Sequence, residues 1–299
     1  TIVPSPEILY TATMILGLVA SLRVLGIRDW RCYGAAFLWG PSFHAVQTGN
    51  VTIPLLLGLA FAWRTRDRLQ WTAIASGLAI ATKIICWPAL VWLAATRRVG
   101  AALSAFGVAF GTTAVLWGLV GFSGLRGYPS SLDRLESAQA PSSYTLTALL
   151  TDAGAPSLVA RGAWAAMVAA VLLGVTVAGR KGDDRLSFSL AVFAAVVASP
   201  IVWLHSFVLL LAPLAIYRPR FGPLWLLPAA LWFGSGTGNG APWQTALVLG
   251  VGAATFVWTV LPRRARLALQ IRLANVIRVN GHPLDSDRPH RRGQGPSPE

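Results

Sequence analysis

Long apolar runs separated by short clusters of arginine are the feature that most constrains this chain. Only 12% of the 299 residues are charged, whereas a soluble domain carries about 25%. Arginine between apolar runs is typical of the cytoplasmic loops of membrane proteins. The sequence therefore predicts an all-α, polytopic transmembrane protein with roughly ten crossing segments. The clusters lie at residues 23–31, 64–68, 97–98, 180–185 and 218–220, and a basic tail follows Arg263.

Charge, cysteine content and missing motifs exclude several classes of function. The net charge of +14 comes from these loop clusters, so we expect no nucleic-acid partner. Cys32 and Cys86 lie in apolar segments and form neither a metal-ligand pattern nor a disulfide framework. Phosphate-loop, zinc-hydrolase and serine-hydrolase motifs do not occur, so no cofactor or metal is expected and a nucleotide-driven pump is disfavoured.

The clusters also predict a topology. If all of them are cytoplasmic, each intervening stretch must cross the membrane and return, and each contains a helix breaker near its middle. Several of the resulting arms are shorter than the roughly 20 residues of a perpendicular helix, which predicts short paired helices. A single helix over 70–96 is the alternative, but it would place Arg97 and Arg98 outside. The predicted arms are 7–25, 31–47, 51–63, 70–82, 84–96, 99–120, 159–179, 187–198, 203–217, 223–233 and 243–261.

This topology gathers the other polar residues on the extracytoplasmic face and leaves arginine on the opposite one. Residues 1–262 are then a transmembrane domain, and 263–299 a basic cytoplasmic tail with a surface helix over 263–279 and a disordered end. The sequence starts without methionine, and we expect the N-terminal portion of the gene product to be missing from it. The outer polar residues are Gln47, Asn50, Lys83, the loop 128–152, His205 and Asn239.

Lys83 is the only lysine or acidic residue inside an apolar run. A charge at membrane depth costs a few kcal/mol, which makes an intramembrane lysine a candidate functional residue. It would bind an anion such as the phosphate of a lipid-linked donor. The alternative is a lysine that snorkels from a helix end.

Other polar residues near helix breaks are further candidates. His205 and Trp203 follow Ser199-Pro200, where aromatic and imidazole groups suit a sugar site. Equally, His205 would serve as an interhelical hydrogen-bonding group. Asn50 would bind a hydroxyl group, or it would cap a helix and form the turn. Any acidic residue on the outer face could act as a general base, but only its location suggests this role. These residues are Glu7, Asp133, Glu136 and Asp152.

Three sequence elements resemble those of glycosyltransferase family 87. Gly49-Asn50-Val51-Thr52 is similar to the family's Gly-Gln/Asn-Val-Asn/Thr element. The stretch from Ser76 to Lys83, followed by Trp87-Pro88, is similar to its Gly-Leu-x-x-x-x-Lys-x-x-Pro element. Ser199-Pro200-Ile201-Val202-Trp203-Leu204-His205 is similar to its Ser-Pro-x-x-Trp-x-His element, and Ser143-Tyr144 corresponds loosely to a polar stretch before a helix.

The resemblance implies a GT-C-like membrane enzyme of the actinobacterial cell envelope. Such an enzyme transfers a hexose, with mannose expected, from a polyprenyl-phosphate donor to a glycolipid or glycan acceptor outside the cytoplasm, with inversion. Lys83 would bind the donor phosphate, and His205, Trp203 and Asn50 would bind substrate. The catalytic aspartate is expected upstream of Thr1. A transporter or flippase, or a catalytically silent paralogue, remains the alternative.

Overall fold

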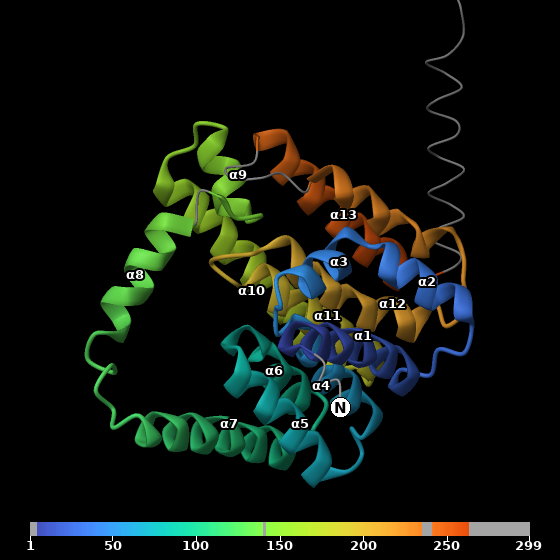
Figure 1. Cartoon of the computed structure of the whole chain (residues 1–299), viewed down its shortest axis with the longest axis horizontal. Helices are drawn as coiled ribbons and strands as arrows, with labels where there is room; N and C mark the ends of the chain where they lie inside the picture. The colour runs from blue at the N-terminus through green and yellow to red at the C-terminus, as the bar shows by residue number, and fades with distance from the viewer. Residues whose placement is uncertain (1–4, 140–141, 235–240, 263–299) are drawn as a thin grey trace, which may run out of the picture. The chain divides into compact units, whose positions relative to one another are not determined.

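A computed structural model describes residues 5–139, 142–234 and 241–262, and this part of the chain is all helical, with no strand (Figure 1). The first helices are α1 (Pro6–Val24), α2 (Trp30–Leu38), α3 (Gly40–Gln47), α4 (Thr52–Arg64), α5 (Leu69–Thr82), the 3-10 turn η1 (Ile84–Cys86), α6 (Pro88–Ala95) and α7 (Val99–Leu119). The later ones are α8 (Tyr128–Gln139), α9 (Leu146–Asp152), α10 (Ser157–Arg180), α11 (Asp184–Val197), η3 (Leu204–Leu210), α12 (Leu211–Tyr217), η4 (Pro223–Trp225), η5 (Leu227–Gly234) and α13 (Pro242–Val260).

Four of these helices, α1, α7, α10 and α13, are long and apolar enough to cross a membrane. The pair α3 and α4 passes the same test together, with a bend of 118° at the break between them. Large apolar side chains on α7, such as Leu103, Phe106 and Phe110, are exposed, which suits contact with lipid. These features confirm an all-α membrane protein with several spans. The number of about ten crossings stays a prediction.

The helix breakers act where the sequence predicts. Helix α5 ends at Thr82, Lys83 is extended with φ −152° and ψ 115°, and α6 starts at Pro88. Residues 70–96 are therefore two arms and not one long helix. Proline suits the first turn of a helix because that turn needs no N–H donor.

Three expectations about local structure are wrong. The arm 31–47 is broken at Trp39, because Pro41 fits only the first turn of a new helix and cannot continue the old one. The polar loop after Gly121 contains α8, which connects the end of α7 to the region of α9 (Figure 1). The arm 203–217 starts as 3-10 helix over Leu204–Leu210 and becomes α-helix only in α12, and the arm 223–233 is 3-10 helix in stretches that contain Pro223 and Pro228.

The arginine-rich loops meet at one end of the helices. Asp184 accepts hydrogen bonds from Arg66 at 3.1 Å, from both terminal nitrogens of Arg98 at 3.0 Å and from Trp92 Nε1 at 2.7 Å. Asp67 forms a further ion pair with Arg98 at 3.0 Å. One carboxylate thus connects the three loops 64–68, 96–98 and 181–184.

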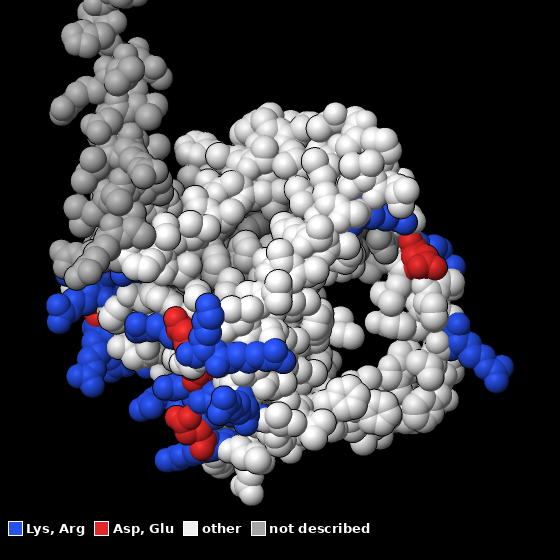
Figure 2. All heavy atoms as spheres, turned by 180° about the vertical axis from the view of Figure 1, so that it is seen from behind, with Lys and Arg blue, Asp and Glu red and all other residues white. Residues whose placement is uncertain are grey.

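Two more clusters join the same end. Arg185 donates to the carbonyl oxygen of Ile216 at 2.6 Å, and the backbone N–H of Phe221 donates to Asp29 at 3.0 Å. Figure 2 shows lysine and arginine side chains gathered in one region with acidic side chains among them, and a smaller charged group on the other side of the view. The predicted gathering of five basic clusters at one end is therefore observed. The basic tail 263–299 and Asn239 lie outside the described residues.

Candidate functional site

The polar residues at the other end of the short helices come together around His205. Its imidazole stacks on that of His44, with ring centroids 5.6 Å apart and an interplanar angle of 17°. Lys83 directly precedes η1, which packs against α11, the helix that ends just before the His205 break. Helix α4 separates this end from the arginine-rich end by 13 residues, or about 20 Å. The turns before α4, after α5 and before η3 thus form one site.

His205 is buried without the partners that a buried imidazole needs. Its side chain is 4% exposed, and neither ring nitrogen has a hydrogen-bond partner within the described part of the chain. The Nδ1 atom of His44 is also buried and without a partner there. A buried polar group left unpaired costs about 1–3 kcal/mol, so such groups call for a ligand or an ordered water. A polar ligand or an ordered water would satisfy these nitrogens.

The backbone around Pro200 sets the position of His205. Helix α11 ends at Val197, whose carbonyl oxygen accepts a hydrogen bond from Trp164 Nε1 at 2.9 Å. Trp203 is extended, with φ −98° and ψ 160°, and η3 starts directly after it. Trp203 is half-buried and lies two residues from His205 in the same break. This interruption places both side chains at the end of α11.

Lys83 occupies the break between α5 and η1. Its side chain is half-buried, and no carboxylate of the described residues lies within ion-pair distance of it. Its backbone N–H still bonds to Ala79 at 3.1 Å, which fixes the residue at the helix end. A lysine held at a helix end without a carboxylate partner, at the same end of the helices as the two imidazoles, could bind an anionic group.

Asn50 has a structural role in the turn before α4. Its Oδ1 atom accepts hydrogen bonds from Thr52 N at 3.1 Å and from Thr52 Oγ1 at 2.6 Å. Gly49 beside it has a φ of +64° and its carbonyl oxygen accepts from the Tyr10 hydroxyl. The side-chain oxygen therefore stabilises the turn, which leaves the amide nitrogen for a ligand.

Two parts of the site escape sequence reasoning. His44 appears in the sequence only as a helix-end residue, and its partner lies far along the chain. The segment before α9 also reaches the site, since the N–H of Tyr144 donates to Val202 at 2.8 Å and its hydroxyl donates to Gly234 at 2.6 Å. The loose correspondence of Ser143-Tyr144 was the only signal for this segment.

A pocket of about 850 Å³ adjoins this segment. It contains two carboxylates, one guanidinium, several hydroxyls and an indole ring, a mixture that suits a sugar. Thr145 and Pro200 belong to it, so the pocket borders the segment that carries His205. Its lining residues are Asp133, Ser137, Thr145, Thr147, Ala148, Thr151, Asp152, Arg161, Trp164, Ala165 and Pro200.

Comparison with known protein families decides the assignment. The model of glycosyltransferase family 87 matches residues 6–206, which is more than half of the chain. The chain belongs to glycosyltransferase family 87. No curated protein and no solved structure matches it significantly.

Membership of family 87 makes the chain a membrane glycosyltransferase, with a lipid-linked sugar donor and an acceptor as its partners. The matched region contains all four residues predicted to bind substrate, namely Asn50, Lys83, Trp203 and His205. Three of them, Lys83, Trp203 and His205, lie close together in space or sequence around the η3 break. Of the two remaining acidic candidates, Glu7 lies in the first turn of α1 and Glu136 lies in α8.

Proposed function

We propose that the protein transfers a hexose, mannose, from a polyprenyl-phosphate donor to a glycolipid or glycan acceptor at the extracytoplasmic face of the cell membrane. The acceptor hydroxyl oxygen forms a bond to the anomeric carbon. The bond from that carbon to the donor phosphate oxygen breaks, and polyprenyl phosphate leaves with the electron pair. A general base takes the hydroxyl proton, and the configuration at the anomeric carbon is inverted.

Lys83 binds the donor phosphate in this proposal. Negative charge grows on the phosphate as it leaves, and a fixed cation in a site shielded from water stabilises that charge. Lys83 is half-buried and pairs with no carboxylate in the part of the chain that the structure describes, which supports this role. The polyprenyl chain would lie along apolar helix surfaces within the bilayer.

His205 binds a hydroxyl or phosphate oxygen, Trp203 packs on the sugar ring, and Asn50 donates from its amide nitrogen. The 850 Å³ pocket takes the acceptor. Asp133 and Asp152 are the carboxylates that line this pocket, and they are the general-base candidates within it. A carboxylate suits this role because it accepts a proton and lies beside the hydroxyl groups that it would activate.

The observation that carries the proposal is the buried His205 imidazole, whose ring nitrogens have no hydrogen-bond partner among the described residues. Lys83, at the same end of the helices, has no carboxylate partner among those residues either. The test uses the complete gene product in membranes with radiolabelled polyprenyl-phosphate-mannose, and follows the label into lipid and glycan acceptors. We expect transfer by the parent. Lys83→Ala and His205→Ala should each lower the rate about 100-fold, because each removes a group that stabilises the transition state.

Lys181→Ala is the matched control, since it removes an exposed lysine from the arginine-rich end. All variants are compared at equal protein level in the membrane. Absence of transfer from this and other polyprenyl-phosphate sugars would overturn the reaction and favour a catalytically silent paralogue. Full activity of Lys83→Ala would instead overturn the assignment of the phosphate site.

A further inference from the structure

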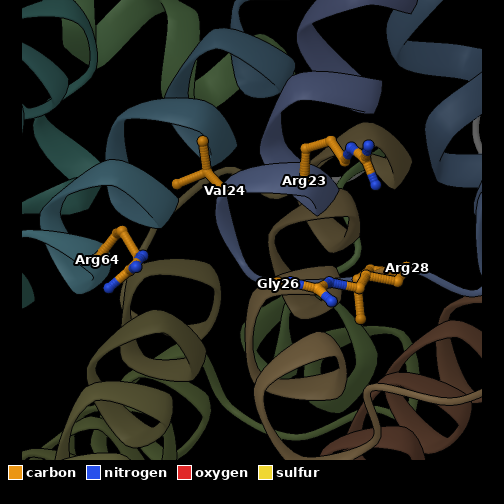
Figure 3. Close-up of a pocket in the computed structure, with 6 residues that line it drawn as sticks. Arg23, Val24, Gly26, Arg28 and Arg64 are labelled. Atoms are coloured by element: carbon orange, nitrogen blue, oxygen red, sulfur yellow. The ribbon is translucent and has the colours of Figure 1, made fainter.

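A second polar pocket lies at the arginine-rich end, far from His205. It has a volume of about 550 Å³. Three arginines from three segments surround it, together with a small apolar wall (Figure 3). The lining residues are Arg23, Val24, Gly26, Ile27, Arg28 and Arg64.

The loop that carries Arg28 is held firmly. The N–H groups of Gly26 and Ile27 bond back to the last turn of α1, to Arg23 at 3.0 Å and Leu22 at 2.9 Å. Gly26 has a φ of +89°, a conformation in which glycine closes a helix without strain. The Ile27 side chain is fully buried and anchors the loop. The pocket is therefore formed before any ligand binds.

Its charges are not balanced by the protein. No carboxylate of the described chain forms an ion pair with Arg23, Arg28 or Arg64, although Arg31, Arg66 and Arg98 at the same end all have aspartate partners. All three arginines are exposed, so their charges are open to an anion from solution or from the membrane surface. Guanidinium groups bind phosphate oxygens with paired hydrogen bonds.

We propose that this pocket binds the phosphate of an anionic phospholipid headgroup. It lies at the end of α1, a helix long and apolar enough to cross a membrane, and the end of such a helix would lie among the headgroups. Val24, which is partly exposed, offers apolar surface beside the charges. Basic pockets between transmembrane helices recognise such headgroups. The pocket is about 20 Å from His205 along α4 and is separate from the donor site.

The test measures binding of phosphatidylglycerol and phosphatidylcholine to the purified full chain by native mass spectrometry. We expect the parent to prefer phosphatidylglycerol. Combining Arg23→Gln, Arg28→Gln and Arg64→Gln should weaken phosphatidylglycerol binding by at least about ten-fold. The single variant Arg28→Gln, in an exposed loop, should weaken phosphatidylglycerol binding less. It replaces the triple variant in the test if the triple variant unfolds.

Arg68→Gln, Arg180→Gln and Lys181→Gln together form the matched control, because they remove three exposed charges from the same end of the molecule. Phosphatidylglycerol binding in this control should stay within about two-fold of the parent. Equal losses of phosphatidylglycerol binding in both triple variants would show that general surface charge, and not this pocket, binds the lipid. Binding of inorganic phosphate that the triple variant loses, without any preference of the parent for phosphatidylglycerol over phosphatidylcholine, would overturn the lipid and favour a free phosphate as the ligand.

Discussion

The imidazole rings of His44 and His205 lie 5.6 Å apart with their planes inclined by 17°. His44 belongs to α3 and His205 to the first turn of η3, so the stack connects two segments that are distant in sequence. Both rings carry buried nitrogens that have no partner among the described residues. His44 therefore packs directly against His205, and in the proposed site its Nδ1 atom would offer a second nitrogen to a bound ligand.

Replacement of His44 separates these two contributions. We expect His44→Ala to lower kcat/KM for glycosyl transfer by about 2–10-fold through lost ring packing, worth about 0.5–1.5 kcal/mol, and further through the lost nitrogen. His44→Phe keeps a ring and should recover only the packing part. Transfer assays on both variants provide the measurement. Parental activity in both would show that His44 contributes nothing.

Asp184 should stabilise the arginine-rich end. Its carboxylate is 24% exposed and accepts bonds from Arg66, Arg98 and Trp92. We expect Asp184→Asn to lower the free energy of unfolding by about 1–3 kcal/mol, because Arg66 loses its carboxylate partner and Arg98 keeps only Asp67. Asp67→Asn is the control. Asp67 is 75% exposed, and its loss should cost less than about 1 kcal/mol. Thermal unfolding in detergent compares them, and equal effects would contradict the prediction.

Gly77 allows α5 and α7 to pack closely. A Cβ atom at this position would lie 2.6 Å from Val108 Cβ and 2.7 Å from the carbonyl oxygen of Ala105. We expect Gly77→Ala to destabilise the protein by about 1–3 kcal/mol. Gly111→Ala on α7 meets no atom within 4 Å and should be neutral or stabilising by up to about 1 kcal/mol. Unfolding curves test the pair, and an equal or greater loss in Gly111→Ala would refute the packing argument.

Asp29 should titrate at unusually low pH. Hydrogen bonds from the Arg31 side chain and the Phe221 N–H hold the pKa of Asp29 at about 2, below its ordinary value of 3.8. Its stabilising contribution is therefore full above about pH 4 and is lost as the pH falls towards 2. The ¹³C resonance of the Asp29 carboxyl should show a midpoint near pH 2. Arg31→Gln should raise that midpoint, and a midpoint near 3.8 in the parent would contradict the interaction.

Much of the helical pattern follows from the sequence, because apolar runs and breakers act locally. For example, α5 ends at Thr82 and α6 begins at Pro88, on either side of the predicted break. The break at Trp39 was missed because Pro41 lies within an otherwise apolar run. Helix α8 was missed because its sequence is polar, and a polar segment between spans is predicted as a loop.

The candidate site was predictable in its parts but not in its pairings. Lys83 and His205 stand out as polar residues in apolar surroundings. The stack of His44 on His205, and the bond from Tyr144 to Val202, join residues far apart in sequence, and only tertiary packing brings them together. Asn50 illustrates the reverse, since a polar residue at a turn often serves the turn, as its bonds to Thr52 show.

The most direct test of the account is binding of the donor by Lys83. Affinity for a polyprenyl-phosphate sugar is measured on purified parent, Lys83→Met and Lys181→Met proteins by displacement of a fluorescent polyprenyl phosphate. A charged hydrogen bond is worth about 1.5–3 kcal/mol, so Lys83→Met should raise Kd by about 10–150-fold, while Lys181→Met leaves it unchanged. The same Kd for all three proteins would contradict the claim that Lys83 holds the donor phosphate.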